Sequence, residues 1–457
     1  MKRLRIAFIP LLRKTFDVDF ATEMIDAVRA QLVKAGFDLV VETDPIADQE
    51  AAGSVAKELD GGSYDLLLIL QATFADSTMV TTLAEATTAP IFLWALPEPW
   101  TGARLRLNSL CGINLAGHAL TLRGIKYGFG YGPPDDETVL DGIHVLAMVG
   151  NLLRKLNSTK LGVVGEHPEG MDSCHLDKTT LKSRFGVTVE SIPLAAVFTR
   201  SRMITDDQVV HIRRGLGKNL NNLGELDPQA VDGTLKVYAA LKAIAAEKRV
   251  EALAVRCWPE FFTELGCAAC GAMSMLSDGF GGQTPLPCSC EADINGTLTQ
   301  FILQTLSGEP AFGTDIVGVD KAADQIALWH CGLAPLSMAD PEEQPRGTIH
   351  SNRQLPLLMD FTLRPGEVTI TRLSRATGDL KLVIGEGEML RAPKPFSGTA
   401  GTLRLKLSAE RFLDALIHQG LEHHVSITYG HFLQPLTVFA DWINLPVVLL
   451  NQKEVIG

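Results

Sequence analysis

The stretch RCWPEFFTELGCAACGAMSMLSDGFGGQTPLPCSCEADINGTLTQ, residues 256–300, decides the predicted fold. It follows a short apolar run, Leu253–Val255, which is typical of a buried parallel strand. Pro259 ends that strand, because proline has no N–H to donate to a neighbouring strand. A second, turn-rich approach at residues 285–290 leads into a helical pattern. In an open α/β domain, ligands bind where strands end, so this stretch is the predicted site.

Three acids lie at the ends of these two elements: Glu260, Glu291 and Asp293. Carboxylate oxygens suit Mg²⁺ or Mn²⁺, and an imidazole from His330 or His431 would complete a metal site. We expect His431 to open a helix. The alternative is that the acids cap helices, since carboxylates satisfy the free N–H groups at a helix start. The pattern leaves open whether Glu291 or Asp293 is the second carboxylate ligand, and whether His330 binds the metal.

The cysteines allow one further kind of site. The spacing Cys267-x-x-Cys270 followed by Cys288-x-Cys290 is compatible with zinc. The second spacing departs from the usual finger pattern, and the first pair lies in an Ala- and Gly-rich helical stretch. We therefore expect reduced thiols in a crowded core.

Composition excludes several classes of protein. The chain has 457 residues, 46% of them hydrophobic, which is enough for a large core. Its net charge of −12 argues against nucleic-acid binding, which requires clustered positive charge. No apolar run reaches transmembrane length. The basic start MKRLRIAFIPLL is followed by Arg13 and Lys14 with no small-residue cleavage site, so we expect a first strand and a cytoplasmic protein.

The order of elements predicts an α/β fold. Residues 1–157 alternate strands and helices, which indicates an open parallel sheet of the Rossmann-like kind. Residues 158–284 repeat this pattern and carry Glu260. Residues 285–457 become strand-rich, with turns such as Pro365-Gly366, and predict a barrel-like α+β domain that carries Asp293 and His431. The expectation is two tandem open-sheet domains followed by a β-rich domain.

The loop after the first strand, which contains Arg13 and Asp17, ends a parallel strand and is a candidate substrate-binding site. Its alternative is an ordinary helix entry capped by Asp17. We also expect Trp258, beside Glu260, to contact the substrate.

Taken together, the motifs WPE (Glu260), CEAD (Asp293), LWHCG (His330) and YGH (His431) resemble the L-fucose isomerase and L-arabinose isomerase superfamily. The resemblance covers most of the chain. It implies that Glu260, Asp293 and His431 bind a divalent metal, most often Mn²⁺, with Mg²⁺ or Co²⁺ as alternatives.

The segments RKTFD and NLAGHALTLRG also resemble amino-terminal loops of this family. That similarity implies that Asn114, His118 and Arg123 contact a substrate. It further implies a homo-oligomer, a trimer or hexamer, in which one subunit's amino-terminal domain covers its neighbour's site.

The predicted activity is isomerisation of a monosaccharide between aldose and ketose through a cis-enediol, with Glu260 and Asp293 exchanging roles as base and acid. Two alternatives stay open. The many arginines on the substrate-facing loops favour an anionic hexose, sulfonated or phosphorylated, because such groups need charge-assisted partners. Tandem α/β domains with a cleft also suit a non-catalytic sugar-binding protein.

Overall fold

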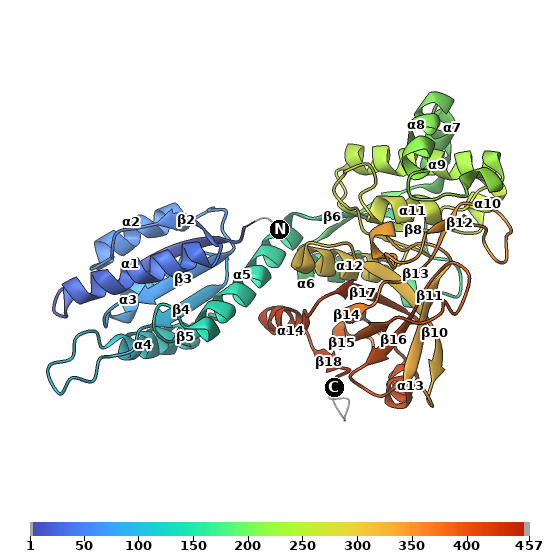
Figure 1. Cartoon of the computed structure of the whole chain (residues 1–457). Helices are drawn as coiled ribbons and strands as arrows, with labels where there is room; N and C mark the ends of the chain where they lie inside the picture. Colours follow the sequence, from blue (N-terminus) through green and yellow to red (C-terminus); the bar gives the residue numbers. More distant parts are fainter. Residues whose placement is uncertain (1–2, 452–457) are drawn as a thin grey trace. The chain divides into compact units, whose positions relative to one another are not determined.

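The computed structural model describes residues 3–451, and the chain divides into two compact units after Leu156. Each unit has its own parallel sheet covered by helices, and the second also has a large antiparallel sheet (Figure 1). The predicted α/β class with a barrel-like carboxy-terminal part is therefore confirmed. The predicted boundary between residues 284 and 285 falls inside the second unit.

The first unit is a five-stranded parallel sheet in the order β2-β1-β3-β4-β5. Its strands are β1 (Arg5–Leu11), β2 (Asp38–Glu42), β3 (Leu66–Gln71), β4 (Ile91–Ala95) and β5 (Gly128–Tyr131). Its helices are α1 (Val18–Lys34), α2 (Gln49–Leu59), α3 (Ser77–Glu85), α4 (Ser109–Leu122) and α5 (Glu137–Ser158). Strands β3 and β4 are buried throughout, as parallel strands covered on both faces must be. The glycine-rich segment 108–132 contains α4.

The second unit begins with a four-stranded parallel sheet in the order β7-β6-β8-β9. Its strands are β6 (Lys160–Val164), β7 (Thr188–Ile192), β8 (Ala252–Val255) and β9 (Cys288–Ser289). The α-helices around it are α6 (Lys178–Phe185), α7 (Leu194–Met203), α8 (Asp206–Leu216), α9 (Pro228–Lys248), α10 (Glu260–Leu265), α11 (Cys270–Ser277) and α12 (Ile294–Ser307). Short 3₁₀ turns are η1 (Asp172–Cys174), η2 (Leu223–Glu225) and η3 (Leu336–Met338).

Six antiparallel strands close into a barrel in the order β16-β11-β10-β17-β14-β15, because β15 also pairs with β16. These strands are β10 (Phe312–Asp320), β11 (Gln325–His330), β14 (Gly366–Ser374), β15 (Lys381–Leu390), β16 (Thr399–Leu405) and β17 (His424–Tyr429). The short strands β12 (Arg346–Thr348), β13 (Leu358–Thr362) and β18 (Val447–Leu449) extend the sheet, and helices α13 (Ala409–His418) and α14 (Leu433–Trp442) accompany it. The predicted helix at His431 begins later, at Leu433, so His431 lies in the loop before it.

Helix α12 joins the two parts of the second unit. It contacts β6, β8 and β9 of the parallel sheet, and β10, β14 and β17 of the barrel. Twelve of its fourteen residues are buried, and one continuous hydrophobic core runs from the sheet into the barrel. The acids that precede α12 therefore lie at the junction of sheet and barrel.

One expectation about the cysteines is wrong. Cys257 and Cys290 form a disulfide with a Cα–Cα distance of 5.8 Å, whereas the sequence predicted reduced thiols. The physical reason is strand pairing: β8 and β9 are parallel neighbours, and each of these cysteines lies just beyond the end of its strand. Cys267, Cys270 and Cys288 are free and buried, as expected.

Within residues 3–451, no helix combines the length and the apolar character needed to cross a membrane.

A glycine in α5 sets how closely this helix packs on the first sheet. A Cβ on Gly150 would lie 1.6 Å from the backbone oxygen of Asp65, which cannot move freely. We expect Gly150→Ala to lower the free energy of unfolding by about 1–3 kcal/mol, as overpacking does. Gly53→Ala in α2 is the matched control, since its Cβ meets nothing within 4 Å. Thermal and urea unfolding measure both, and equal stability of the two variants would contradict the packing argument.

Candidate active site

Asp293 is the anchor of the site. Its backbone is extended, and its side chain caps α12 by accepting a hydrogen bond from the Gly296 N–H at 2.9 Å. Arg372 on β14 donates to both carboxylate oxygens, at 2.5 and 3.1 Å. The side chains of Asp293 and Arg372 are only 1% and 2% exposed, so this ion pair is shielded from water. The capping role that the sequence allowed for the acids is thus real for Asp293.

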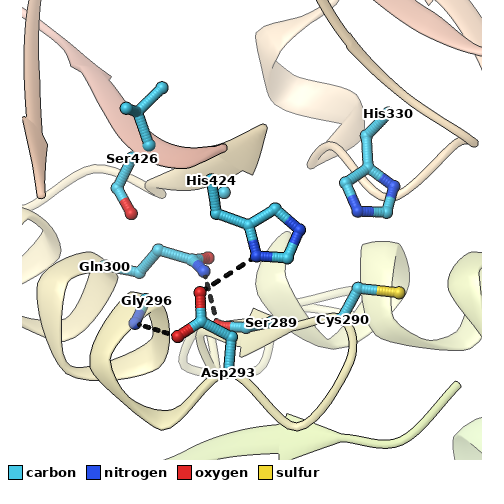
Figure 2. A pocket seen from close by; sticks show the side chains of 10 residues that line it. Ser289, Cys290, Asp293, Gly296, Gln300, His330, His424 and Ser426 are labelled. Carbon is cyan, nitrogen blue, oxygen red and sulfur yellow. Dashed lines mark hydrogen bonds and ion pairs between the residues drawn. The ribbon is translucent and has the colours of Figure 1, made fainter. Parts of the chain in front are cut away.

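His424 receives its orientation from Asp293. Its Nδ1 lies 3.0 Å from Oδ2 of Asp293. Figure 2 draws this contact as a dashed line. The other ring nitrogen, Nε2, lies 3.2 Å from Asp315 on β10 and 3.7 Å from Glu291. Asp315 and His424 are direct partners in the register of β10 and β17. When a carboxylate accepts a hydrogen bond from one ring nitrogen of a histidine, the other nitrogen can bind a metal ion. Most metal-binding histidines have this arrangement.

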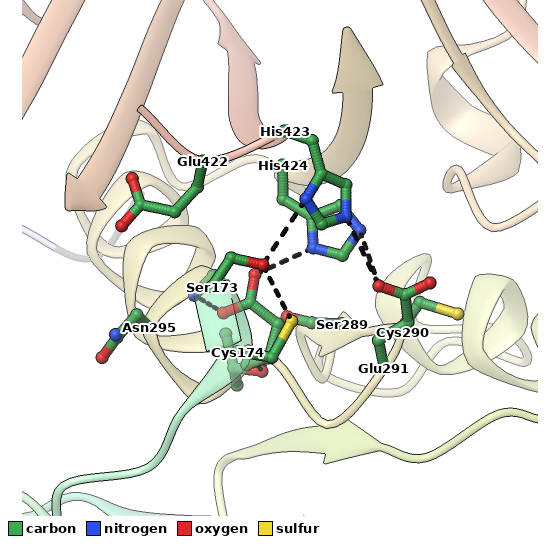
Figure 3. Close-up of polar contacts among 12 residues, drawn as sticks. Ser173, Cys174, Ser289, Cys290, Glu291, Asn295, Glu422, His423 and His424 are labelled. Atoms are coloured by element: carbon green, nitrogen blue, oxygen red, sulfur yellow. Dashed lines mark hydrogen bonds and ion pairs between the residues drawn. The ribbon is translucent and has the colours of Figure 1, made fainter. Parts of the chain in front are cut away.

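Glu291 faces the two histidines at the start of β17 (Figure 3). Its Oε2 lies 3.4 Å from Nε2 of His423, and its Oε1 accepts a hydrogen bond from the Trp258 indole at 3.4 Å. Glu291 and Ala292 both have positive φ angles, 58° and 54°. Residues other than glycine rarely adopt this left-handed backbone conformation. Backbone strain of this kind is concentrated at functional sites.

Burial and charge shape the titration of these groups. Burial by itself raises the pKa of Asp293, but the Arg372 guanidinium and His424 outweigh it and lower the pKa. For Glu291, burial again opposes ionisation, while the close contact with His423 and the charge of His424 lower the pKa. Burial disfavours the imidazolium of His424, yet its hydrogen bond to Asp293 and its close contact with Asp315 raise its pKa well above the ordinary value. Both carboxylates are therefore ionised at neutral pH.

Two overlapping groups of side chains could hold a metal ion here. Asp315, His330 and His424 offer ligand atoms within 4.8 Å of one another, and so do Cys174, Glu291 and His424. Oε2 of Glu291 and Oδ1 of Asp315 lie 3.2–3.7 Å from imidazole nitrogens of His423 and His424, but neither buried oxygen has a well-directed hydrogen-bond partner. Buried carboxylate oxygens need such a partner or a cation, so this donor set fits a divalent metal.

Two cavities adjoin the cluster. One of about 10 Å³, lined by Asp293, His330 and His424 among others, has room for about one water molecule. The other, of about 710 Å³, is lined by Ser173, Asn295, Arg375, Glu422 and His423 among others. This volume falls within the usual range for small-molecule pockets.

The three residues that the sequence grouped as metal ligands have different partners in the structure. Glu260 is the first residue of α10 and forms an ion pair with Arg256 at 2.8 Å. His431 is 61% exposed and lies 3.5 Å from Glu386. Among the residues described, Glu260, Asp293 and His431 do not form one of the groups able to share a metal. Trp258 and His330, by contrast, do lie beside Glu291 and His424, respectively.

The remaining predicted residues lie in the first unit. Arg13 pairs with Asp76 at 2.8 Å, and Asp17 caps α1 while accepting a hydrogen bond from Arg106. Asn114 and His118 are exposed and four residues apart on α4, so they share one face of that helix. Arg123 ends α4 and lies 3.4 Å from Glu85.

Sequence reasoning missed four members of the site. They are Cys174, Asp315, Arg372 and His424. The His-His pair before a strand was visible in the sequence, but nothing in it indicated which carboxylates it would face. Asp315 and Arg372 come from β10 and β14, and only strand pairing brings them to α12.

Comparison with known proteins identifies the class. Residues 7–157 match the family model "Fucose/sulfoquinovose isomerase, N-terminal domain", and residues 358–451 match "L-fucose isomerase, C-terminal domain". The chain belongs to the fucose isomerase-like family and is an aldose–ketose isomerase.

The similar curated proteins include the sulfoquinovose isomerases of Priestia aryabhattai and Alkalicoccus urumqiensis. Each is 30% identical over 448 residues, covering 97% of this chain and 99% of the relative. The relative of the same name from Clostridium sp. (strain MSTE9) is 30% identical over 449 residues, with the same coverage.

Among solved structures, a solute-binding protein from Burkholderia multivorans covers 68% of this chain and 95% of its own, at 11% identity and a TM-score of 0.20. A similarity this low carries no argument about fold or function.

The buried pair of Asp293 and Arg372 gives a stability prediction. Arg372→Met should lower the free energy of unfolding by about 3–5 kcal/mol, because it leaves the Asp293 charge buried and unpaired. Arg346→Met is the control, since it removes an exposed pair with Glu225 and should cost at most about 1 kcal/mol. Urea denaturation compares them, and a loss for Arg372→Met as small as that of the control would disprove the anchoring role.

Proposed function

We propose that this chain isomerises a sulfonated hexose between its aldose and ketose forms, with a divalent metal held at the Glu291–His424 cluster. The observation that carries the substrate class is the full-length similarity to proteins named sulfoquinovose isomerase. This favours the anionic alternative over a neutral sugar as the main substrate.

Glu291 and His424 are our candidate metal ligands, with Asp315 and His330 beside them. The buried oxygens of Glu291 and Asp315, which no well-directed hydrogen bond satisfies, support this assignment. Mn²⁺ is the expected ion, with Mg²⁺ or Co²⁺ as alternatives. When bound, such an ion polarises a carbonyl and makes the neighbouring C–H more acidic.

Asp293 is a positioning residue in this proposal. It accepts hydrogen bonds from the Gly296 N–H, Arg372 and His424, so it has little capacity left to take up a proton. We assign proton removal to Glu291 instead, followed by return of the proton to the adjacent carbon of a cis-enediol.

Arg375 is our candidate contact for the sulfonate. It lines the 710 Å³ cavity together with His423, which touches Glu291. Its Nη2 lies 3.4 Å from Asp177, while its Nη1 is buried without a hydrogen-bond partner. A guanidinium edge of this kind can donate to a sulfonate oxygen.

The family resemblance supports two further proposals. One is a homo-oligomer with a shared active site. The other is that the substrate is contacted by Arg13, Asp17, Asn114, His118 and Arg123.

The substrate class can be tested by turnover. We expect kcat/KM for 6-deoxy-6-sulfoglucose to exceed that for glucose and L-fucose by at least about tenfold, and chelator treatment to abolish turnover until Mn²⁺ is restored. Glucose 6-phosphate distinguishes a sulfonate from a phosphate preference. Apoprotein as active as the Mn²⁺-loaded enzyme would refute the metal, and equal kcat/KM for neutral and sulfonated sugars would refute the anionic substrate.

The Arg375→Met variant sharpens the same test. It should lower kcat/KM for the sulfonated sugar by about 10–100-fold, which is the expected effect of losing a hydrogen bond to a charged group. The kcat/KM for neutral sugars should change little. Arg346→Met, which removes an exposed arginine elsewhere, is the matched control.

The ligand assignment predicts a contrast between two pairs of variants. Glu291→Gln and His424→Asn should lose bound metal and lower kcat by about 10²–10⁴-fold, as expected for a lost base or ligand. Glu260→Gln and His431→Asn are the comparison and should keep their metal. Elemental analysis and steady-state kinetics measure both effects. Metal loss in the second pair alone would restore the assignment made from the sequence.

Running these assays in heavy water tests the proton path. A cis-enediol exchanges the transferred hydrogen with solvent, so deuterium should appear at C1 or C2 of the product. Complete retention of the substrate hydrogen over many turnovers would contradict the enediol route.

A further inference from the structure

One buried amide beside the candidate active site has no partner in the protein. Asn295 is the second residue of α12, and only 3% of it is exposed. Its backbone oxygen accepts a hydrogen bond from Thr299 at 2.6 Å, but none of the residues that the structure describes forms a hydrogen bond with its side chain. In Figure 3 no dashed line reaches the Asn295 amide. Buried polar groups nearly always have a hydrogen-bond partner, so this amide indicates a place for a bound molecule.

Asn295 lines the cavity of about 710 Å³, where the neighbouring polar side chains are already engaged. Oγ of Ser173 lies 3.5 Å from Nδ1 of His423. Glu422 accepts a hydrogen bond from the backbone N–H of Arg375 at 2.8 Å. The amide of Asn295 therefore differs from these side chains, because both its donors and its acceptor remain available to a molecule in the cavity.

An amide of this kind suits the hydroxyl groups of a sugar. It offers two N–H donors and one carbonyl acceptor, and a hydroxyl can both donate and accept. A sulfonate instead requires a charged donor, such as Arg375 in the wall of the same cavity. A site that hydrogen-bonds a substrate hydroxyl also rejects analogues without that hydroxyl, because its own polar group would then stay unpaired.

The two ends of the proposed substrate leave its middle for Asn295. The reacting carbons C1 and C2 belong at the cluster of Glu291 and His424, and the sulfonate on C6 belongs at Arg375. The cavity adjoins that cluster, because His423 lines it and lies 3.4 Å from Glu291. The hydroxyls on C3, C4 and C5 are then the groups that an amide in this cavity can meet.

We propose that Asn295 is a specificity-determining residue, whose amide hydrogen-bonds a hydroxyl between the reacting carbons and the sulfonate. This inference rests on the function proposed above and adds a contact to the same site. The start of α12 holds two groups with different tasks. Asp293 caps the helix and orients His424, while Asn295, two residues later, contacts the sugar.

A cycle of protein and substrate changes tests this contact. We would measure kcat/KM of the wild type and of Asn295→Ala on 6-deoxy-6-sulfoglucose and on its 3-deoxy, 4-deoxy and 5-deoxy analogues. Asn295→Ala should lower kcat/KM for the complete substrate by about 3–10-fold, which is the expected effect of one neutral hydrogen bond. For at least one analogue the variant should equal the wild type, because the hydroxyl that the amide would bind is already missing.

The same cycle separates a sugar contact from a structural role. If Asn295→Ala merely disturbed the site, it would lower kcat/KM by the same factor for all four sugars. That result, or no loss for the complete substrate, would overturn the proposal.

A second variant and a control support the comparison. Asn295→Leu keeps the size of the side chain and removes its polar atoms, so it should show the same dependence on the analogue even if alanine loosens the helix. Asn221→Ala removes an exposed asparagine that does not line the cavity, and it should leave kcat/KM for all four sugars unchanged. Bound metal and thermal unfolding, measured for each variant, report whether the site and the fold are intact.

The wild-type enzyme distinguishes failure of this proposal from failure of the proposed substrate. If the wild type prefers a neutral sugar to the sulfonated one, the anionic substrate is refuted. The same cycle on deoxy analogues of that neutral sugar then still decides the role of Asn295.

Discussion

The ion pair between Asp293 and Arg372 is the interaction on which the second unit depends. Each charge would be costly in this core if it stood alone, because burial removes its hydration. Together they satisfy one another, and Asp293 also caps α12 and accepts from His424. The pair therefore ties a loop of the parallel sheet, a central helix and strand β14 of the barrel at one point.

The chemistry of the site follows from that constraint. With Nδ1 of His424 held by Asp293, its Nε2 must face Asp315 and Glu291. The strained backbone at Glu291 turns its carboxylate toward the same place. The result is a pair of buried carboxylate oxygens that face imidazole nitrogens without a well-directed hydrogen bond, next to a cavity large enough for a sugar.

We assign different roles to the three acids because their surroundings differ. Asp293 is surrounded by donors and stays ionised, so it orients other groups and transfers no proton. Glu291 has fewer partners and is the acid best able to meet a ligand. Glu260, which resembles a ligand in sequence, is held by Arg256 four residues before it. Residue type alone does not distinguish these three environments.

Much of this protein was determined by the sequence alone. Alternation of apolar runs with helical patterns predicted the α/β units and the barrel-like end, because strand and helix periods are local properties of the chain. The motifs around Glu260 and Asp293 indicated the sugar isomerase family, and the CEAD segment contains Glu291 and Asp293 of the candidate site. Tertiary structure decided which side chains meet there. His424, Asp315 and Arg372 reach the site through the antiparallel register of β10, β14 and β17, and Cys257 meets Cys290 through parallel pairing of β8 and β9. Register depends on contacts between segments distant in sequence, so no local pattern contains it.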